Sequence, residues 1–120
     1  SIPRRGTPAP ICADESFHSL ADLESMRGRY DYINIKLDKC GGLTEALKII
    51  EAAPRYELRC MVGCMFATSL AIAPALVVAS LCDFADLDAP LHLANDRAGG
   101  FRIANGAYET RSSQLWGQPA

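Results

Sequence analysis

Residues 32–42, with the sequence YINIKLDKCGG, decide the fold that this chain predicts. The stretch opens on an apolar run in which isoleucines alternate with Asn34 and Lys36, and this period of two predicts a strand. The two glycines that close it allow a tight turn. Residues 43–50 then repeat apolar side chains at helical spacing, and Pro54 ends that helix. A strand followed by a helix is the repeating unit of a parallel α/β sheet.

Three further apolar runs repeat this unit on either side. They lie at residues 11–13, 59–62 and 84–87, and the starts of the four successive runs are 21, 27 and 25 residues apart. Helical spacing recurs between them, at residues 20–26 and 69–80, with Thr68 or Ser69 as the N-cap of the latter helix. We therefore expect an α/β fold in which parallel strands alternate with helices.

The composition excludes several classes of protein. A chain of 120 residues with 49% hydrophobic and 22% charged residues can form the core of one domain. Twelve basic and fourteen acidic residues without a basic stripe argue against a nucleic-acid binder. Five cysteines and two histidines show neither disulfide nor zinc-ligand spacing. We expect small core residues at Cys12, Cys60 and Cys82, and surface or packing residues at His18 and His92.

Residues 60–82 contain no charge, and a run of this length raises the alternative of a membrane span. Gly63, Thr68, Ser69 and Pro74 interrupt the run, however. A buried strand followed by a packed helix explains it without a bilayer, so we expect no membrane partner.

The ends of the chain predict less structure than its middle. We expect a ragged start over residues 1–8, the main body over 9–104 with a short strand at 101–103, and an irregular polar tail over 105–120. The chain opens without methionine or a hydrophobic signal segment, which favours a processed start or a piece of a longer protein.

Polar side chains stand at the carboxyl end of each predicted strand. Because these ends open on one face of a parallel α/β fold, we expect the side chains to converge there. In chain order they are Asp14 and Glu15, then Lys36, then Cys64 after Gly63, and finally Asp86 and Asp88.

Each of these residues also has an ordinary structural interpretation. Asp14, like Ser16, is a candidate helix N-cap, and taken alone this is the favoured role for Asp14. Lys36 fits a surface lysine, yet it lies opposite the isoleucines, on the face that a closed barrel turns inward, where an unused lysine is costly. Asp86 and Asp88 lie on one side of an extended segment. They fit either a solvated loop or a pair that holds a cation or an ammonium group.

Three motifs closely resemble the enolase superfamily, its muconate-lactonizing group and, within it, the dipeptide epimerases of the L-Ala-D/L-Glu type. They are Ala-Asp-Glu-Ser at residues 13–16, Ile-Lys-Leu with Gly-Gly at 35–42, and Asp-x-Asp-Ala-Pro at 86–90. The resemblance covers residues 10–100. It implies the C-terminal half of a modified TIM barrel, strands five to eight, and therefore a partial domain.

The resemblance also implies a function and roles for individual residues. It implies a magnesium-dependent isomerase that racemises the second residue of a dipeptide such as Ala-Glu, by proton abstraction and an enolate intermediate. Asp14 matches the third magnesium ligand, Lys36 the acid/base lysine, Cys64 a residue that lines the substrate, and Asp86 and Asp88 the pair that holds the α-ammonium group. Magnesium prefers such oxygen ligands, and a lysine whose pKa falls toward roughly 7–8 can serve as the base.

The same resemblance implies that the second lysine and two further metal ligands lie upstream of Ser1. Lys39 and Lys48 do not replace them, so we expect the 120-residue chain to be inactive alone. We also expect a cytoplasmic location and a homo-oligomeric full-length form. Residues 54–57 and 108–120 depart from the family's pattern. Alternatives on the same fold are muconate cycloisomerase, o-succinylbenzoate synthase and N-acylamino acid racemase; the alternative of another class is a small doubly wound binding module.

Overall fold

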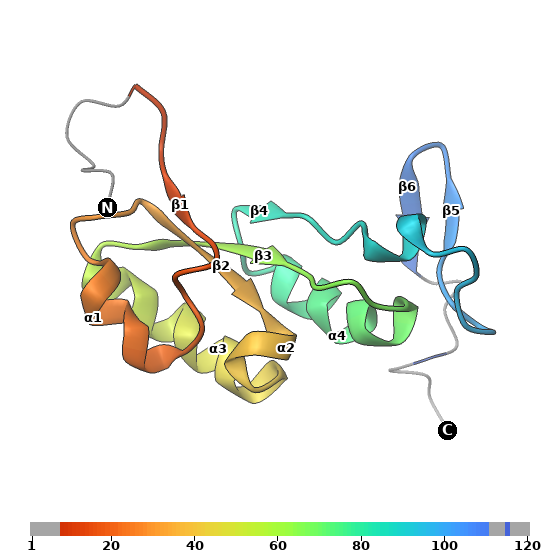
Figure 1. Cartoon of the computed structure of the whole chain (residues 1–120), viewed down its shortest axis with the longest axis horizontal. Helices are drawn as coiled ribbons and strands as arrows, with labels where there is room; N and C mark the ends of the chain where they lie inside the picture. Colours follow the sequence, from red (N-terminus) through yellow and green to blue (C-terminus); the bar gives the residue numbers. More distant parts are fainter. Residues whose placement is uncertain (1–7, 111–114, 116–120) are drawn as a thin grey trace.

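A four-stranded parallel sheet forms the centre of the protein (Figure 1). The computed structural model of the chain describes residues 8–110 and residue 115. The spatial order of the strands is their sequence order, as in one section of a barrel wall, and the predicted α/β fold with parallel strands is confirmed. The strands are β1 (Cys12–Ala13), β2 (Tyr32–Lys36), β3 (Arg59–Gly63) and β4 (Phe84–Ala85).

The helices that connect the strands lie on one side of this sheet, and within the described residues the other side carries no helix (Figure 1). The predicted helices are present, although the first begins with a 3-10 turn and the second is preceded by a short helix that the sequence pattern does not predict. In chain order the helical segments are η1 (Leu20–Asp22), α1 (Leu23–Met26), α2 (Leu37–Cys40), α3 (Leu43–Ala52), η2 (Ala53–Tyr56), α4 (Ser69–Ala79) and η3 (Ala89–His92).

The period of two in β2 divides its side chains between the two faces of the sheet. Ile33 and Ile35 are buried toward the helices, and each pairs with a buried residue of β3. Lys36 lies on the opposite face, in register with Gly63. The core therefore lies between the sheet and the helices, and its largest fully buried side chains are Phe17, Leu23, Ile33, Ile35, Ile49, Ile72, Val62 and Val78.

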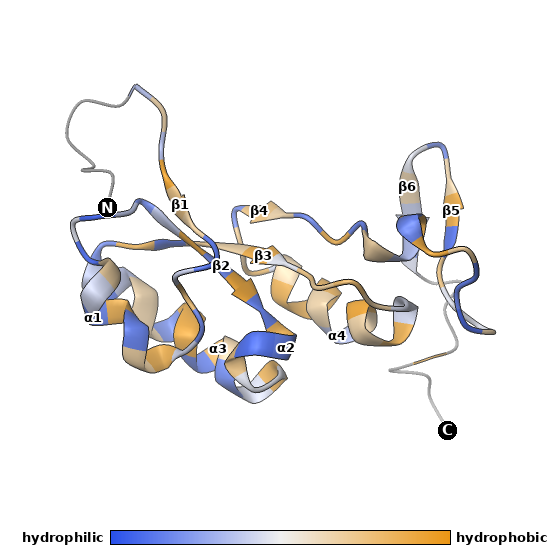
Figure 2. Cartoon of the chain, in the orientation of Figure 1, coloured by the Kyte–Doolittle hydropathy of each residue, from blue (hydrophilic) through white to orange (hydrophobic). Residues whose placement is uncertain are grey.

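The uncharged run at residues 60–82 divides into β3 and α4, which the chain packs against the same core. The helix α4 begins after the N-cap Thr68, as predicted, and carries hydrophobic residues over most of its surface (Figure 2). Among the helices of the described residues, none is long and apolar enough to cross a bilayer.

The end of the described chain is more ordered than we expect from the sequence. The short strand predicted at residues 101–103 is present as β5 (Arg102–Ala104), and β6 (Ala107–Glu109) pairs with it in an antiparallel hairpin. The expectation of an irregular tail is therefore wrong for β6. Its two-residue turn, Asn105 and Gly106, has positive φ at both positions, which is the Asn-Gly signal of a hairpin. Residues 1–7, 111–114 and 116–120 of the predicted ragged ends lie outside the described residues.

The cysteines correct one prediction. Cys60 is buried and Cys82 half-buried, but Cys12 is exposed rather than part of the core. The alternation along β1 turns Ala13 toward the helices and Cys12 toward the uncovered face of the sheet.

The molecule is elongated, with principal extents of 45 × 29 × 19 Å. Its radius of gyration is 15.4 Å, above the roughly 14 Å expected for a compact domain of this length. An open sheet with helices on one face accounts for this shape, as expected of a partial domain.

Candidate active site

Lys36 is the last residue of β2 and, among the described residues, the one charged residue that the fold buries. Its relative exposure is 9%, so the surface-lysine interpretation is wrong. The chain turns into α2 directly after it. The strand thus fixes the lysine at the carboxyl edge of the sheet, where neighbouring strands also end.

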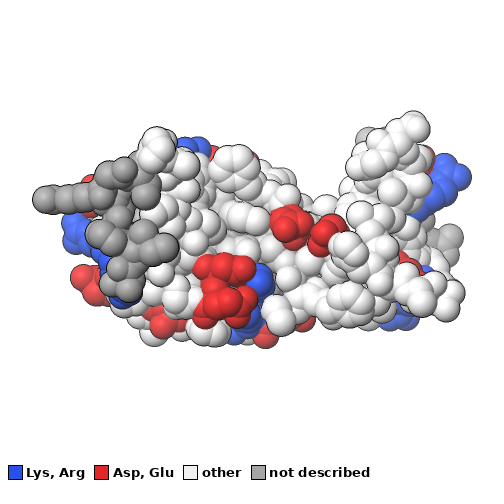
Figure 3. Space-filling model, turned by 45° about the horizontal axis from the view of Figure 1, so that its top comes forward, with Lys and Arg blue, Asp and Glu red and all other residues white. Residues whose placement is uncertain are grey.

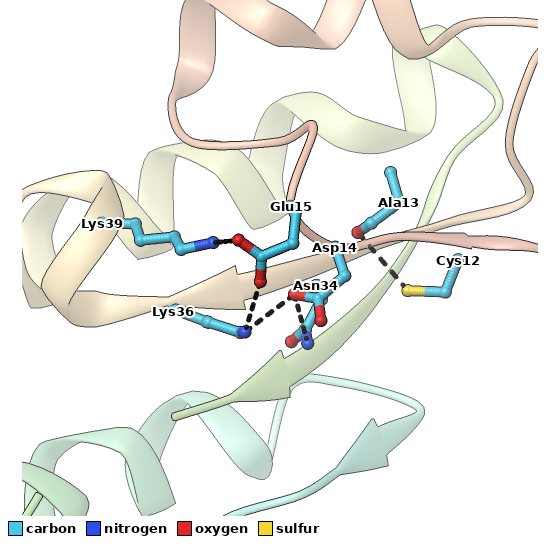
Figure 4. Close-up of polar contacts among 7 residues, drawn as sticks. All are labelled: Cys12, Ala13, Asp14, Glu15, Asn34, Lys36 and Lys39. Atoms are coloured by element: carbon cyan, nitrogen blue, oxygen red, sulfur yellow. Dashed lines mark hydrogen bonds and ion pairs between the residues drawn. The ribbon is translucent and has the colours of Figure 1, made fainter. Parts of the chain in front are cut away.

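Two carboxylates that follow β1 meet this lysine (Figure 4). The Nζ atom of Lys36 lies 2.9 Å from Oδ1 of Asp14 and 3.5 Å from Oε1 of Glu15. Glu15 also accepts a hydrogen bond of 3.0 Å from Nζ of Lys39. The N-cap of the first helical segment is Ser19, so the N-cap interpretation of Asp14 and Ser16 is wrong.

These contacts determine the charge state of the cluster. The hydrogen bond to Asp14 raises the pKa of Lys36 and outweighs the opposing effect of burial. The hydrogen bond from Lys39 lowers the pKa of Glu15. A lysine serves best as a base when its pKa is lowered, whereas in this structure Asp14, within hydrogen-bond distance, raises the pKa of Lys36. The cluster is therefore made of ion pairs at neutral pH.

Asn34 is a fifth member of this cluster, beside Asp14, Glu15, Lys36 and Lys39, and sequence reasoning missed it. Its Nδ2 donates a hydrogen bond of 3.2 Å to Oδ1 of Asp14, the oxygen that also faces Lys36. Its own oxygen, Oδ1, is buried and has no hydrogen-bond partner. Such an unsatisfied buried group costs about 1–3 kcal/mol. The signal in the sequence is a polar residue two positions before Lys36, on the same face of an apolar strand.

The next strand brings Gly63 and Cys64 to the same edge. Cys64 is half-buried, and burial raises the pKa of its thiol. The charges of Asp88, Asp86 and Lys36 all act on this thiol. Cys64 therefore lies between the lysine cluster and the aspartates that follow β4.

Asp86 and Asp88 lie on one side of the segment after β4, because Leu87 between them is buried and both aspartates are exposed. Asp88 is not free, since its Oδ2 lies 2.9 Å from Nε2 of His92. His92 is at the surface, as predicted, but this contact was not expected. The hydroxyl of Tyr108 donates a hydrogen bond of 2.6 Å to the carbonyl of Leu87 and so ties the hairpin to this segment.

The donor chemistry of the site fits one part of a magnesium site. Asp14 offers a carboxylate whose second oxygen, Oδ2, has no protein donor among the described residues, and magnesium prefers such oxygen ligands. The described residues contain no group of three acidic, histidine or cysteine side chains that could hold a metal ion by themselves. Figure 3 shows acidic and basic side chains in contact near the middle of a largely uncharged face.

Comparison with known proteins finds a matching family model and similar racemases and epimerases. The enolase C-terminal domain-like family model matches residues 3–114. An N-acetyl-D-glutamate racemase from a Pseudoalteromonas species is 46% identical over 111 residues, which are 92% of this chain and 35% of that protein. The L-Ala-D/L-Glu epimerase of Escherichia coli K12 is 48% identical over 99 residues, 82% of this chain and 31% of that protein. The chain thus spans about a third of the length of these relatives.

Similar solved structures include a dipeptide epimerase and a protein with homology to dipeptide epimerases. An enolase family member from Agrobacterium tumefaciens with homology to dipeptide epimerases, with bound sodium and L-Ala-L-Glu, is 55% identical with a TM-score of 0.82. The match covers 92% of this chain and 34% of that one. A dipeptide epimerase from Methylococcus capsulatus in complex with a magnesium ion is 37% identical with a TM-score of 0.69, over 79% and 30% of the two chains.

Proposed function

This chain belongs to the enolase C-terminal domain-like family, and from that premise we propose that it is the C-terminal part of a magnesium-dependent dipeptide epimerase. Such an isomerase inverts the α-carbon of the second residue of a dipeptide such as Ala-Glu. The relatives named as epimerases and the solved structure with bound L-Ala-L-Glu support this substrate class.

The observation that carries the proposal is the contact between Lys36 and Asp14. The two side chains come from the carboxyl ends of neighbouring parallel strands, and 2.9 Å separates Nζ from Oδ1. A lysine and a metal-binding carboxylate that meet at this edge can serve one substrate carbon and the carboxylate next to it.

In the proposed reaction Lys36 transfers the α-proton at its Nζ atom on one face of the substrate. Asp14 would be one ligand of magnesium, which when bound stabilises the negative charge that develops on the substrate carboxylate. Glu15 forms ion pairs with both Lys36 and Lys39, and it thereby holds the ammonium group of Lys36 in place. Asn34 holds Asp14.

Inversion requires a second proton donor on the opposite face of the α-carbon. Lys39 is paired with Glu15, and Lys48 lies on α3, paired with Glu45. We therefore place the second donor, and the remaining metal ligands, in a part of the protein outside this chain. The 120-residue chain alone is then expected to have no epimerase activity.

Substrate choice is the role that we assign to Asp86 and Asp88, with Cys64 beside them. Two carboxylates on one side of a segment suit the α-ammonium group of a dipeptide. An N-acylamino acid racemase is the second candidate, because one of the similar relatives is an N-acetyl-D-glutamate racemase. Its substrate has no free ammonium group and does not need this pair.

The experiment that separates the two candidates compares substrates in the intact protein that contains this chain. We expect deuterium from D2O to enter the glutamyl α-position of L-Ala-L-Glu, in a magnesium-dependent reaction followed by proton NMR. N-acetylglutamate is expected to exchange far more slowly. The reverse order of rates would favour the racemase, and exchange of neither substrate would remove the proposed function. The cytoplasmic location and the homo-oligomeric form stay predictions.

A further inference from the structure

Asn34 is a buried polar residue on the face of β2 that also carries Lys36. It is the third residue of β2, between two buried isoleucines, and its relative exposure is only 7%. A buried amide is costly unless both its donor and its acceptor are satisfied. Only the donor side has a partner among the described residues, so packing alone does not explain this residue.

The partner of Asn34 links it to the reacting groups. Its Nδ2 reaches Oδ1 of Asp14 at 3.2 Å, and Nζ of Lys36 reaches the same oxygen at 2.9 Å (Figure 4). Two donors from one strand thus fix the carboxylate that follows the neighbouring strand. Both occupy Oδ1, which leaves Oδ2 without a protein donor among the described residues.

Gly63 provides the space that this arrangement needs. A Cβ atom at this position would lie 2.6 Å from Oδ1 and 2.8 Å from Nδ2 of Asn34. The φ angle of Gly63 is not in the left-handed region, so its backbone does not require glycine. The lack of a side chain on β3 is what allows the amide to lie beside it.

We propose that Asn34 is a positioning residue, which orients Asp14 so that one carboxylate oxygen faces Lys36 and the other is free for the metal ion. Gly63 has the supporting role, because the absence of a side chain there leaves room for the Asn34 amide. This inference rests on the proposed function, because it assigns Asp14 a metal ion and Lys36 a proton. Groups that orient a metal ligand typically change metal affinity or activity by about 10- to 100-fold when they are removed.

The test uses Asn34→Leu in the intact protein, since leucine has nearly the shape of asparagine but no donor. We expect magnesium binding, measured by isothermal titration calorimetry, to weaken at least about tenfold, and kcat for L-Ala-L-Glu to fall by a similar factor. KM is expected to change less than about threefold. The Tm should stay the same or rise, because the unsatisfied Oδ1 is removed. The control is Asn95→Leu at an exposed position.

A lower Tm with unchanged magnesium affinity would show that Asn34 is merely structural and would overturn the proposal. If Asn34→Leu does not fold, Gly63→Ala decides. It should weaken magnesium binding, and in an Asn34→Ala background it should cause no further loss, because the clash is gone. Wild-type magnesium affinity in Gly63→Ala would overturn the proposal. Calorimetry needs no turnover, so magnesium binding tests this inference even in a protein without epimerase activity. An intact protein that binds magnesium but does not epimerise dipeptides would therefore contradict the proposed function alone.

Discussion

The lysine cluster and the aspartate segment lie on the same edge of the sheet but are held in different ways. Lys36 and Asn34 are buried on a five-residue strand, and their contacts reach Asp14 within 3.2 Å. Asp86 and Asp88 are exposed and follow a strand of only two residues. Proton transfer needs fixed distances, whereas recognition of an ammonium group tolerates a less rigid site. The difference fits the proposed roles, in which Lys36 and Asp14 act on the substrate carbon and Asp86 and Asp88 select the substrate.

The largest expected loss of activity comes from a substitution in the lysine cluster. In the intact protein, Asp14→Ala should lower kcat/KM for L-Ala-L-Glu by at least about 10³-fold, because the proposed metal ligand and the partner of Lys36 are lost together. Magnesium affinity, measured by calorimetry, should fall with it. Glu15→Gln is the matched control and should keep magnesium affinity, since among residues 8–110 the side chain of Glu15 pairs with Lys36 and Lys39 alone. Equal losses in both variants would contradict the distinct role of Asp14.

A smaller and different effect is expected in the exposed segment. Replacing Asp86 and Asp88 together by asparagine should raise KM for L-Ala-L-Glu by about 10- to 100-fold. Each asparagine keeps a neutral hydrogen bond of about 0.5–1.5 kcal/mol where aspartate makes a charge-assisted one of about 1.5–3 kcal/mol to the ammonium group. The kcat should change little. Steady-state kinetics measures both, with Asp83→Asn as the control, since Asp83 pairs with Arg59 ahead of β4. A loss confined to kcat would assign these aspartates to chemistry instead.

Loss of the hydrogen bond between Tyr108 and Leu87, which holds the segment of Asp86 and Asp88, should have a weaker effect. Tyr108→Phe removes the hydrogen bond to the carbonyl of Leu87 but keeps the ring against Phe101. We expect KM for the dipeptide to rise about two- to tenfold, as for the loss of one neutral hydrogen bond. Tyr56→Phe, at the end of η2, is the control. Unchanged KM in Tyr108→Phe would mean that the hairpin does not position Asp86 and Asp88.

The smallest effect concerns stability. Burial would raise the pKa of Asp96, but hydrogen bonds from the Ser69 hydroxyl and backbone outweigh it and lower that pKa. The bonds therefore stabilise the fold fully above the ordinary carboxyl pKa of about 4, and this contribution is lost as pH falls through the lower pKa of the folded state. Asp96→Ala should cost about 1–2 kcal/mol at pH 7, as for a lost helix cap. Urea unfolding at pH 7 and pH 3 should show that Asp96→Asn reduces the loss on acidification, and an equal loss in both proteins would contradict this.

The same contrast explains what the sequence could predict. The parallel strands, α3 and α4 follow from periodicity, and the meeting of Asp14 and Lys36 at one edge follows from the rule that parallel strands share their carboxyl ends. These features depend on local pattern and topology. The Asn-Gly turn of the hairpin was also readable but was overlooked.

Other features depend on distances that no local pattern specifies. The contact of Ser69 with Asp96 joins residues 27 positions apart, and that of Tyr108 with Leu87 joins residues 21 apart. The pKa of Lys36 is raised because its Nζ atom lies 2.9 Å from Asp14. Such contacts arise from tertiary packing, and the sequence pattern alone does not reveal them.

The central claim, that Lys36 moves the α-proton, has one direct measurement. It is the rate at which deuterium from D2O enters the α-position of L-Ala-L-Glu and L-Ala-D-Glu in the intact protein and in Lys36→Ala, with Lys48→Ala as the matched lysine control on α3. The account predicts that Lys36→Ala loses exchange of at least one diastereomer by about 10²- to 10⁴-fold, while Lys48→Ala exchanges both at the wild-type rate. Wild-type exchange of both diastereomers by Lys36→Ala would contradict it.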